Sequence, residues 1–131
     1  MGGSRMKKIL LYLWQLPQNL LGLAVILFSR AKKTAWYDDV YFTKMRFGVS
    51  LGNYIIVNIL DTDSTIRHET GHRKQSQYLG WLYLLVIGLP SILGNIWDRL
   101  FHKHWDLYKR ITWYYKQPWE AWADKLGNVN R

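Results

Sequence analysis

The chain has 131 residues, enough for one compact domain, and combines 49% hydrophobic and 16% aromatic residues with a formal net charge of +9. It contains no cysteine, so disulfides, thiolate zinc sites and cysteine nucleophiles are excluded, and any metal must be held by histidine and carboxylate side chains. The eight tryptophans, the nine tyrosines and the basic excess favour a negatively charged neighbour, either anionic lipid or nucleic acid.

The chain opens with Met-Gly-Gly-Ser-Arg over residues 1–5, ahead of Met6 and two lysines. This start is typical of a cloning remnant before a natural initiator at Met6, so we expect a single domain over residues 6–131. An apolar stretch follows over residues 9–29. A cleavable signal peptide shares the basic start, but here no small-residue cleavage site follows and polar residues interrupt the stretch.

A second apolar stretch covers residues 79–97, again with basic residues on both sides. Each stretch is about 20 residues long, which is the length of a membrane-spanning helix. Proline removes a backbone donor and clashes with the preceding turn, so Pro17 and Pro90 should each divide a stretch into two pieces of about ten residues. We therefore expect kinked spans, or hairpins that enter the membrane and return. The alternative is a pair of buried core helices in a soluble protein.

Strand-like sequence lies between the two apolar stretches. Residues 36–45 alternate loosely between apolar and polar side chains, and residues 47–60 are rich in β-branched and aromatic residues, with Gly48 and Gly52 among them. We predict a β-hairpin that turns near residues 46–48.

Three helices are predicted after the strands. Capping candidates at residues 61–64 place the first helix over residues 65–78. An aromatic, polar helix is expected over residues 97–115, and a last, short helix over residues 118–127, with proline in its first turn and glycine at its end.

The first of these helices carries His68, Glu69 and His72 in the pattern HExxH. Residues four apart lie on one face of a helix, so both imidazoles can reach one ion, and Glu69 can hold a water bound to that ion. Zinc lowers the pKa of such a water to about 7, and the carboxylate takes its proton as the water attacks a carbonyl. Gly71 costs about 1 kcal/mol against alanine in a helix, which indicates that another element passes close there. The competing interpretation is a pair of surface histidines.

A third metal ligand must come from elsewhere in the chain. The candidates are His102, His104, Glu120 and Asp124. His102 and His104 alternate with a lysine beside an aromatic run, which favours an interfacial basic patch over metal ligation.

Residues 120–124 read Glu-Ala-Trp-Ala-Asp and match the motif E-x-x-A-D. Together with HExxH, this resembles the gluzincin metallopeptidases, in the membrane-bound branch that includes the CAAX prenyl endopeptidases and the heat-shock membrane proteases. Residues 68–76, HETGHRKQS, also resemble the HExGHxxQS form found in small uncharacterised bacterial membrane proteins. The resemblance implies that Glu120 is the third zinc ligand and that Asp124, one turn later, orients a ligand histidine.

Tyr114 and Tyr115 precede the last helix. A phenol at this point can stabilise an oxyanion that develops over the open coordination position. A packing or interface role is the simpler interpretation, and we assign neither tyrosine to the site.

The candidate ligands constrain how the second apolar stretch meets a membrane. If residues 79–97 crossed a bilayer once, His68 and His72 would lie on one side and Glu120 about 30 Å away on the other, too far to share an ion. We therefore predict that both apolar stretches bend at their prolines and that the zinc site lies at or near the membrane surface.

These features predict an α+β fold that is predominantly α: a minimal zincin-like core (β-hairpin, HExxH helix, ExxAD helix) with two proline-broken apolar helical hairpins associated with a membrane. The favoured function is a zinc metallopeptidase of the bacterial inner membrane, integral or monotopic, acting on a peptide or protein. Zn²⁺ would be held by His68, His72 and Glu120, with Glu69 as general base. The alternative is a non-catalytic structural or interaction protein of the membrane that zinc stabilises. No nucleic-acid partner is expected, because no recognition motif is present.

Overall fold

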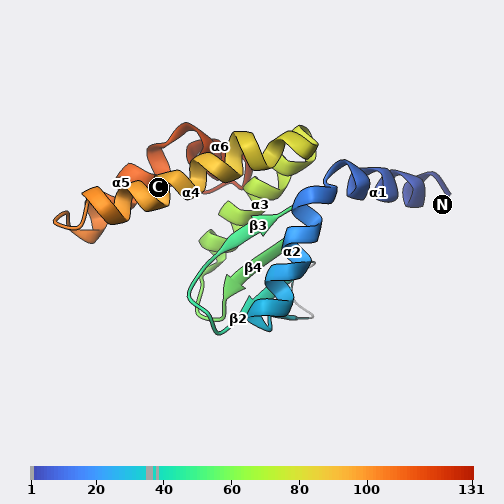
Figure 1. The fold of residues 1–131 in the computed structure, drawn as a ribbon, viewed down its shortest axis with the longest axis horizontal. Helices are drawn as coiled ribbons and strands as arrows, with labels where there is room; N and C mark the ends of the chain where they lie inside the picture. The colour runs from blue at the N-terminus through green and yellow to red at the C-terminus, as the bar shows by residue number, and fades with distance from the viewer. Residues whose placement is uncertain (1, 35–36, 38) are drawn as a thin grey trace.

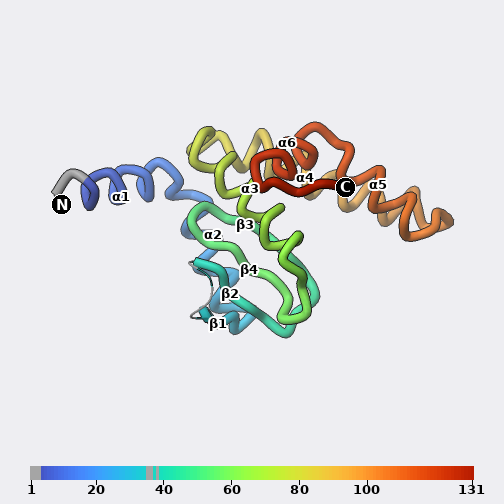
Figure 2. The backbone as a smooth tube through the Cα atoms, turned by 180° about the vertical axis from the view of Figure 1, so that it is seen from behind, coloured from blue at the N-terminus to red at the C-terminus, as the bar shows by residue number. Residues whose placement is uncertain are grey.

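The computed structural model describes residues 2–34, 37 and 39–131, and these residues form an α+β fold that is mostly helical, as predicted (Figure 1; Figure 2). In chain order the elements are α1 (Gly2–Trp14), α2 (Leu16–Ser29), β1 (Lys32–Lys33), β2 (Val40–Thr43), β3 (Val49–Leu51), β4 (Tyr54–Asn58), α3 (Asp63–Leu79), a 3-10 turn (Gly80–Leu82), a π-helical turn (Leu84–Gly88), α4 (Leu89–Phe101), α5 (Leu107–Lys116) and α6 (Pro118–Leu126). Trp36, where the first strand-like segment was predicted to begin, lies outside the described residues.

The four strands form one mixed sheet in the order β1-β2-β4-β3. β3 and β4 are antiparallel, and the turn between them uses Gly52 at φ +65°, a left-handed conformation that glycine adopts without steric cost. β2 instead lies parallel to β4. The hairpin was therefore predicted at the wrong glycine. It turns at Gly52, whereas residues 44–48 connect β2 to the far edge of the sheet.

Helices cover both faces of the sheet, with α2 on one face and α3 on the other (Figure 1; Figure 2). The central strand β4 is consequently buried on both sides, and Ile55, Ile56 and Val57 have no exposed surface. Ile66 of α3 packs with Val40, Ile55 and Val57 in the main apolar cluster. The sheet thus fixes the position of α3, the helix that contains the HExxH motif.

The first apolar stretch bends where it was predicted to bend. α1 and α2 meet at Gln15 at an angle of 82°, and Pro17 lies in the first turn of α2, where its missing N–H breaks no helical hydrogen bond. The two helices are therefore nearly perpendicular. They do not form the hairpin that was one of the two predicted shapes.

The second apolar stretch does not bend at its proline, contrary to prediction. Leu84–Phe101 is one continuous helix that begins with the π-helical turn. In that turn the Leu89 N–H donates to the carbonyl of Leu84, five residues earlier. The wider turn leaves room for the ring of Pro90 and needs no donor from it.

The return toward α3 is made by a separate helix. α5 runs back along α4, because Ser91 lies 3.0 Å from the Tyr114 hydroxyl and Asp98 lies 2.8 Å from Arg110. The side chain of Asp106 accepts a hydrogen bond in the first turn of α5 and starts that helix anew. The single aromatic helix predicted for this region is therefore two helices joined by a turn.

Within the described residues, one helix, Leu84–Phe101, is long and apolar enough to cross a membrane. α1 and α2 provide a second candidate only if the bent pair is counted as a single span. Only 11% of the Leu84–Phe101 window is buried inside the protein. A core helix of a soluble protein is mostly buried, so this helix does not fit that alternative.

Candidate metal centre

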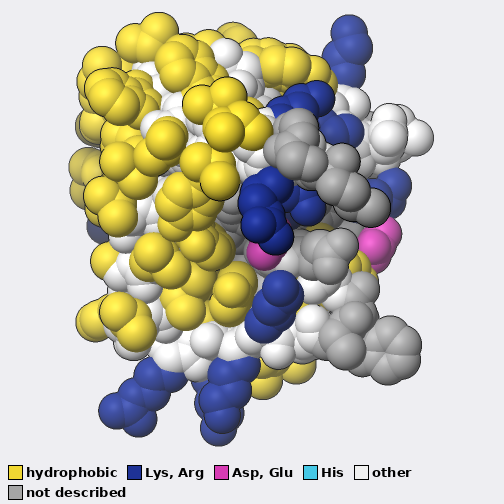
Figure 3. Space-filling view, turned by 90° about the vertical axis from the view of Figure 1, so that its right-hand side faces the viewer, with side chains coloured by type: hydrophobic (Ala, Val, Ile, Leu, Met, Phe, Trp, Pro, Cys, Tyr) yellow, Lys and Arg dark blue, Asp and Glu magenta, His cyan; other side chains and the backbone are white. Residues whose placement is uncertain are grey.

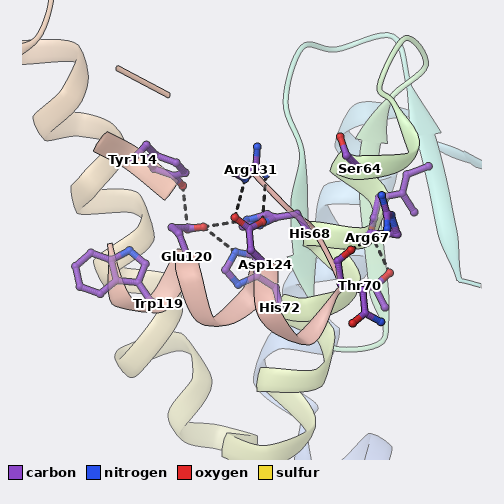
Figure 4. A network of polar contacts seen from close by, with 12 residues as sticks. Ser64, Arg67, His68, Thr70, His72, Tyr114, Trp119, Glu120, Asp124 and Arg131 are labelled. Carbon is purple, nitrogen blue, oxygen red and sulfur yellow. Dashed lines mark hydrogen bonds and ion pairs between the residues drawn. The ribbon is translucent and has the colours of Figure 1, made fainter. Parts of the chain in front are cut away.

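Helix α6 crosses α3 at the HExxH motif, and Gly71 makes the crossing possible. A Cβ atom at Gly71 would overlap the backbone carbonyl of Ala123, so any other residue would push the two helices apart. The close approach predicted from this glycine is thus confirmed. It brings Glu120 and Asp124 of α6 next to the histidines of α3 (Figure 4).

Three side-chain atoms converge between the two helices. Glu120 Oε2 lies 3.0 Å from His68 Nε2 and 3.0 Å from His72 Nε2, and all three side chains are buried. A tetrahedral ion with bonds of about 2.0 Å separates neighbouring ligand atoms by about 3.3 Å. The group can therefore hold a metal ion, and Glu120 is the one of the four candidate third ligands that points its oxygen at both histidines.

The far nitrogen of each imidazole is already engaged. His68 Nδ1 lies 2.7 Å from Asp124 Oδ1, and His72 Nδ1 lies 2.7 Å from Gln75 Oε1. Both partners are acceptors, so each Nδ1 carries a proton and each Nε2 can direct its lone pair at the shared point. Asp124 thus has the orienting position that the resemblance implied. Gln75 has the same position for the other histidine, and the sequence reasoning had assigned it no role.

The second oxygen of Glu120 is held by hydroxyl groups. Ser91 Oγ donates to Glu120 Oε1 at 2.6 Å, and the Tyr114 hydroxyl donates to the same atom at 3.0 Å. These two bonds fix the carboxylate so that Oε2 faces the histidines. Tyr114 therefore contacts the cluster as a donor to Glu120. Ser91 was missed because no sequence signal links it to a residue 29 positions away.

Glu69 lies beside this group, and one of its oxygens has no partner. Glu69 is 7% exposed, and its Oε2 is buried without a hydrogen bond. Burial raises the pKa of this carboxyl above its usual value, although His72 and His68 partly oppose the rise. An unpartnered buried oxygen is unfavourable on its own and fits a role in holding a water or an ion.

When no metal is bound, the cluster balances its charge with a proton. Burial alone would lower the pKa of His72, but the carboxylates of Glu120 and Glu69 outweigh it and raise that pKa from 6.5 to about 9. Burial would also raise the pKa of Glu120, yet hydrogen bonds from His68 and His72 lower it. The histidines thus form ion pairs with Glu120 when they are protonated. A proton and a metal ion therefore compete for the position between the imidazole Nε2 atoms and the Glu120 carboxylate.

Tyr115 and Arg131 extend the network away from the ligands. The Tyr115 ring meets His68 edge-on at a centroid distance of 4.9 Å, and the Arg131 guanidinium lies 3.4 Å from the Tyr115 ring centre. Arg131 also pairs with Asp124 at 2.6 Å (Figure 4). Tyr115 therefore packs against His68, in agreement with the packing role predicted for it.

The remaining candidate ligands lie elsewhere. His102 is buried at the turn between α4 and α5, where Nδ1 lies 3.0 Å from Asp98 and the ring stacks on Trp105 at 3.7 Å. It is therefore a packed histidine, and the interfacial patch predicted for it is wrong. His104 is exposed on the same turn.

The two motifs therefore meet although the apolar helix does not bend at Pro90. α5 runs back along α4, and this brings the next helix, α6 with Glu120, to α3.

A comparison of the chain with protein-family models, with curated proteins and with solved structures finds no match.

Proposed function

We propose that this chain is a membrane-associated zinc peptidase of the gluzincin type, the group that its two motifs resemble. One observation carries the proposal: Glu120 Oε2 lies 3.0 Å from both histidine Nε2 atoms, while Glu69 beside them has an unpartnered oxygen. Two imidazoles, one carboxylate and a nearby second carboxylate are the donor set of a hydrolytic zinc site.

Zinc, when bound, polarises a substrate carbonyl and lowers the pKa of a water to about 7. Glu69, which is buried beside the three ligands, would accept a proton from that water. The same carboxyl can then pass the proton to the departing amine. Asp124 and Gln75 keep the ligand imidazoles in the required tautomer throughout.

The proposed substrate is an extended peptide segment. β3 is an edge strand of the described sheet, and Gly48 directly before it lies beside Glu69, where a Cβ would be 3.8 Å from Glu69 Oε1. A peptide that pairs with an edge strand adds to the sheet through main-chain hydrogen bonds. One carbonyl of this strand, that of Ser50, already accepts from the Tyr83 hydroxyl at 3.2 Å, so Tyr83 would border the bound peptide.

Replacing Glu69 with glutamine tests the mechanism. The Glu69→Gln protein, purified in mild detergent, should keep its zinc and lose hydrolysis of a fluorogenic peptide library by at least about a hundredfold. Asp63→Asn is the matched control, because Asp63 is a carboxylate of the same helix that pairs with Arg67 on the surface. It should keep both zinc and turnover. Unchanged turnover in Glu69→Gln would reject the mechanism.

A second function has one observation in its favour. The three ligands and Glu69 are at most 7% exposed, which leaves a substrate little access in this conformation. A non-catalytic membrane protein that zinc stabilises would have such a closed site. This alternative predicts that chelation unfolds the protein while no peptide is hydrolysed at any zinc loading.

A further inference from the structure

Helix α2 has polar residues on its inner side and apolar residues on its outer side. Its buried residues are Gln18, Asn19, Gly22 and Ser29. Leu27 and Phe28, in contrast, are 80% and 77% exposed. Helices of water-soluble proteins show the opposite arrangement, with an apolar stripe against the core. The outer side of α2 is therefore suited to an apolar surrounding.

The helix Leu84–Phe101 has the same inverted character. Its outer stripe, with residues 47% to 65% exposed, includes Leu85, Leu89, Ile92, Leu93, Ile96, Trp97 and Leu100. Its inner side meets the protein through polar groups, because Ser91 bonds to Tyr114 and Asp98 pairs with Arg110. The spacing of the stripe follows the helical repeat, so the apolar residues form a single face.

Both helices lie on the same broad side of the molecule. In Figure 1, drawn down the shortest axis, α2 lies in front of the sheet and α4 in front of α6, and Figure 2 shows both at the back. Figure 3 views the molecule from the right-hand side of Figure 1, and hydrophobic side chains gather over its left part, toward the front of Figure 1, with Lys and Arg at their border. We call the outer surface of α2 and Leu84–Phe101 the apolar face.

We propose that the apolar face lies flat in one leaflet of an anionic bilayer, so that the chain is monotopic and no helix crosses the membrane. This inference rests on the membrane association proposed above and not on catalysis. The partner is lipid, and the group of His68, His72 and Glu120 lies directly behind the face, because Ser91 of Leu84–Phe101 donates to Glu120.

Helix α5 is the reason for a flat and not a crossing orientation. It runs alongside α4 and carries Lys109, Arg110 and Lys116, so a crossing by α4 would take these cations into the hydrocarbon. Charged side chains at that depth are costly. Lying flat immerses only the apolar stripe. α1 and α2 are also too short to cross singly, at 13 and 14 residues, and the 82° bend prevents them from crossing as one straight helix.

The charges favour lipid over a second copy of the chain. Basic residues lie near the helices of this side, with Lys7 and Lys8 within α1, Arg30 directly after α2 and Arg99 in the last turn of α4. Such residues attract an anionic leaflet, whereas a dimer through this face would bring together two chains of charge +9. Trp81 and Trp97, both more than half exposed, suit the headgroup level.

The orientation can be measured directly, because the chain has no cysteine and single-cysteine variants carry one label each. The protein is bound to preformed vesicles of phosphatidylcholine containing phosphatidylglycerol, with a fluorescent probe at position 85, 93 or 100. Lipids brominated at different depths should quench all three probes at the same shallow depth. A membrane-impermeant thiol reagent should label cysteines at positions 82 and 103 from the same side. Depths that progress across the bilayer, or labelling from opposite sides, would overturn the proposal.

A double variant and a matched control variant test the apolar face. Leu27→Asp combined with Leu93→Asp should weaken vesicle binding at least about tenfold and leave zinc content unchanged, since both side chains point away from the protein. Leu60→Asp is the control: it changes a leucine that is 83% exposed between β4 and α3, outside the face, and should bind like the parent. A lipid-free dimer that the double variant dissociates, or equal binding by all variants, contradicts the proposal. Loss of hydrolysis in Glu69→Gln with vesicle binding intact keeps the two proposals separable.

Discussion

Two buried polar clusters hold helix α3, one at its C-terminal turn and one at its centre, and they satisfy their hydrogen bonds in different ways. The first, the glutamine cluster, consists of Gln15, Gln18 and Ser76, all without exposed surface. The Gln18 amide donates to Ser76 Oγ at 3.0 Å and to the Gly80 carbonyl at 2.6 Å, and Ser76 donates to Gln15 Oε1 at 2.6 Å. Each of these bonds joins a donor to an acceptor. Gln18 Oε1 has no partner, but the cluster carries no charge, so it does not need a cation to hold it together.

The second, the metal cluster, consists of His68, Glu69, His72 and Glu120, and in it acceptors face acceptors. Two imidazole Nε2 atoms and the Glu120 carboxylate converge, while Glu69 Oε2 has no donor at all. Only a cation, either a proton or a metal ion, can make this arrangement favourable. Buried polar residues alone thus do not indicate a ligand site. A local excess of acceptors does.

The largest expected effect is the loss of a metal ligand. Glu120→Ala removes the one oxygen that faces both histidines, so we expect zinc affinity to fall by more than about a hundredfold in a competition titration with a chelator. A variant that kept the parent's affinity would show that zinc is bound elsewhere.

A substitution in the glutamine cluster should lower the stability of the fold and leave zinc binding unchanged. Gln18→Leu leaves the Gly80 carbonyl and Ser76 without their donor, so the free energy of unfolding should fall by about 2–4 kcal/mol in denaturant titrations. Zinc stoichiometry in the folded protein should not change. If this variant lost zinc as Glu120→Ala does, the two clusters would not be independent.

A smaller effect is expected from the groups that orient the ligands. Asp124→Ala removes the acceptor at His68 Nδ1 and should weaken zinc binding by about 10- to 100-fold. Arg131→Gln breaks the ion pair but leaves that hydrogen bond, so its effect should stay below about tenfold. Equal losses in the two variants would argue that Asp124 acts through its pair with Arg131.

The last expected effect is a pH dependence that differs between the metal-free and zinc-loaded protein. The folded pKa of His72 is about 9 against 6.5 for an unperturbed histidine, so the folded, metal-free chain binds the extra proton. Its added stability is complete below about pH 6.5 and is lost as the pH rises to about 9. Zinc displaces that proton, so the stabilisation by zinc should grow over the same range. Thermal unfolding curves with parallel pH trends would contradict this competition.

Much of the site could be predicted because its signals are local. His68 and His72 share a helix face by spacing alone, Gly71 indicated a close neighbour, and residues 120–124 supplied a motif with a known partner. Gln75 lies one turn from His72 and was visible in the sequence, but nothing in the pattern said that its side chain would turn to a ligand. Ser91 carried no signal, because its role depends on how α4 packs.

The errors in the fold have a common origin in long-range context. Pro90 breaks a regular α-helix, but a π-helical turn accommodates it, and sequence patterns do not reveal such a turn. The turn was predicted near Gly48, but the pairing of β3 with β4 places it at Gly52. The polar residues at Gln15, Gln18 and Asn19 interrupt an apolar stretch because they face the protein, and their partners lie 34 to 62 positions away.

Zinc-edge X-ray absorption of the reconstituted protein tests the central claim most directly. We expect a shell of about four nitrogen and oxygen ligands near 2.0 Å, with the multiple scattering of two imidazoles and no sulfur. In Glu69→Gln this shell should be unchanged, and in His72→Ala one imidazole should be lost. A parent spectrum with one imidazole or none would contradict a centre built from His68, His72 and Glu120.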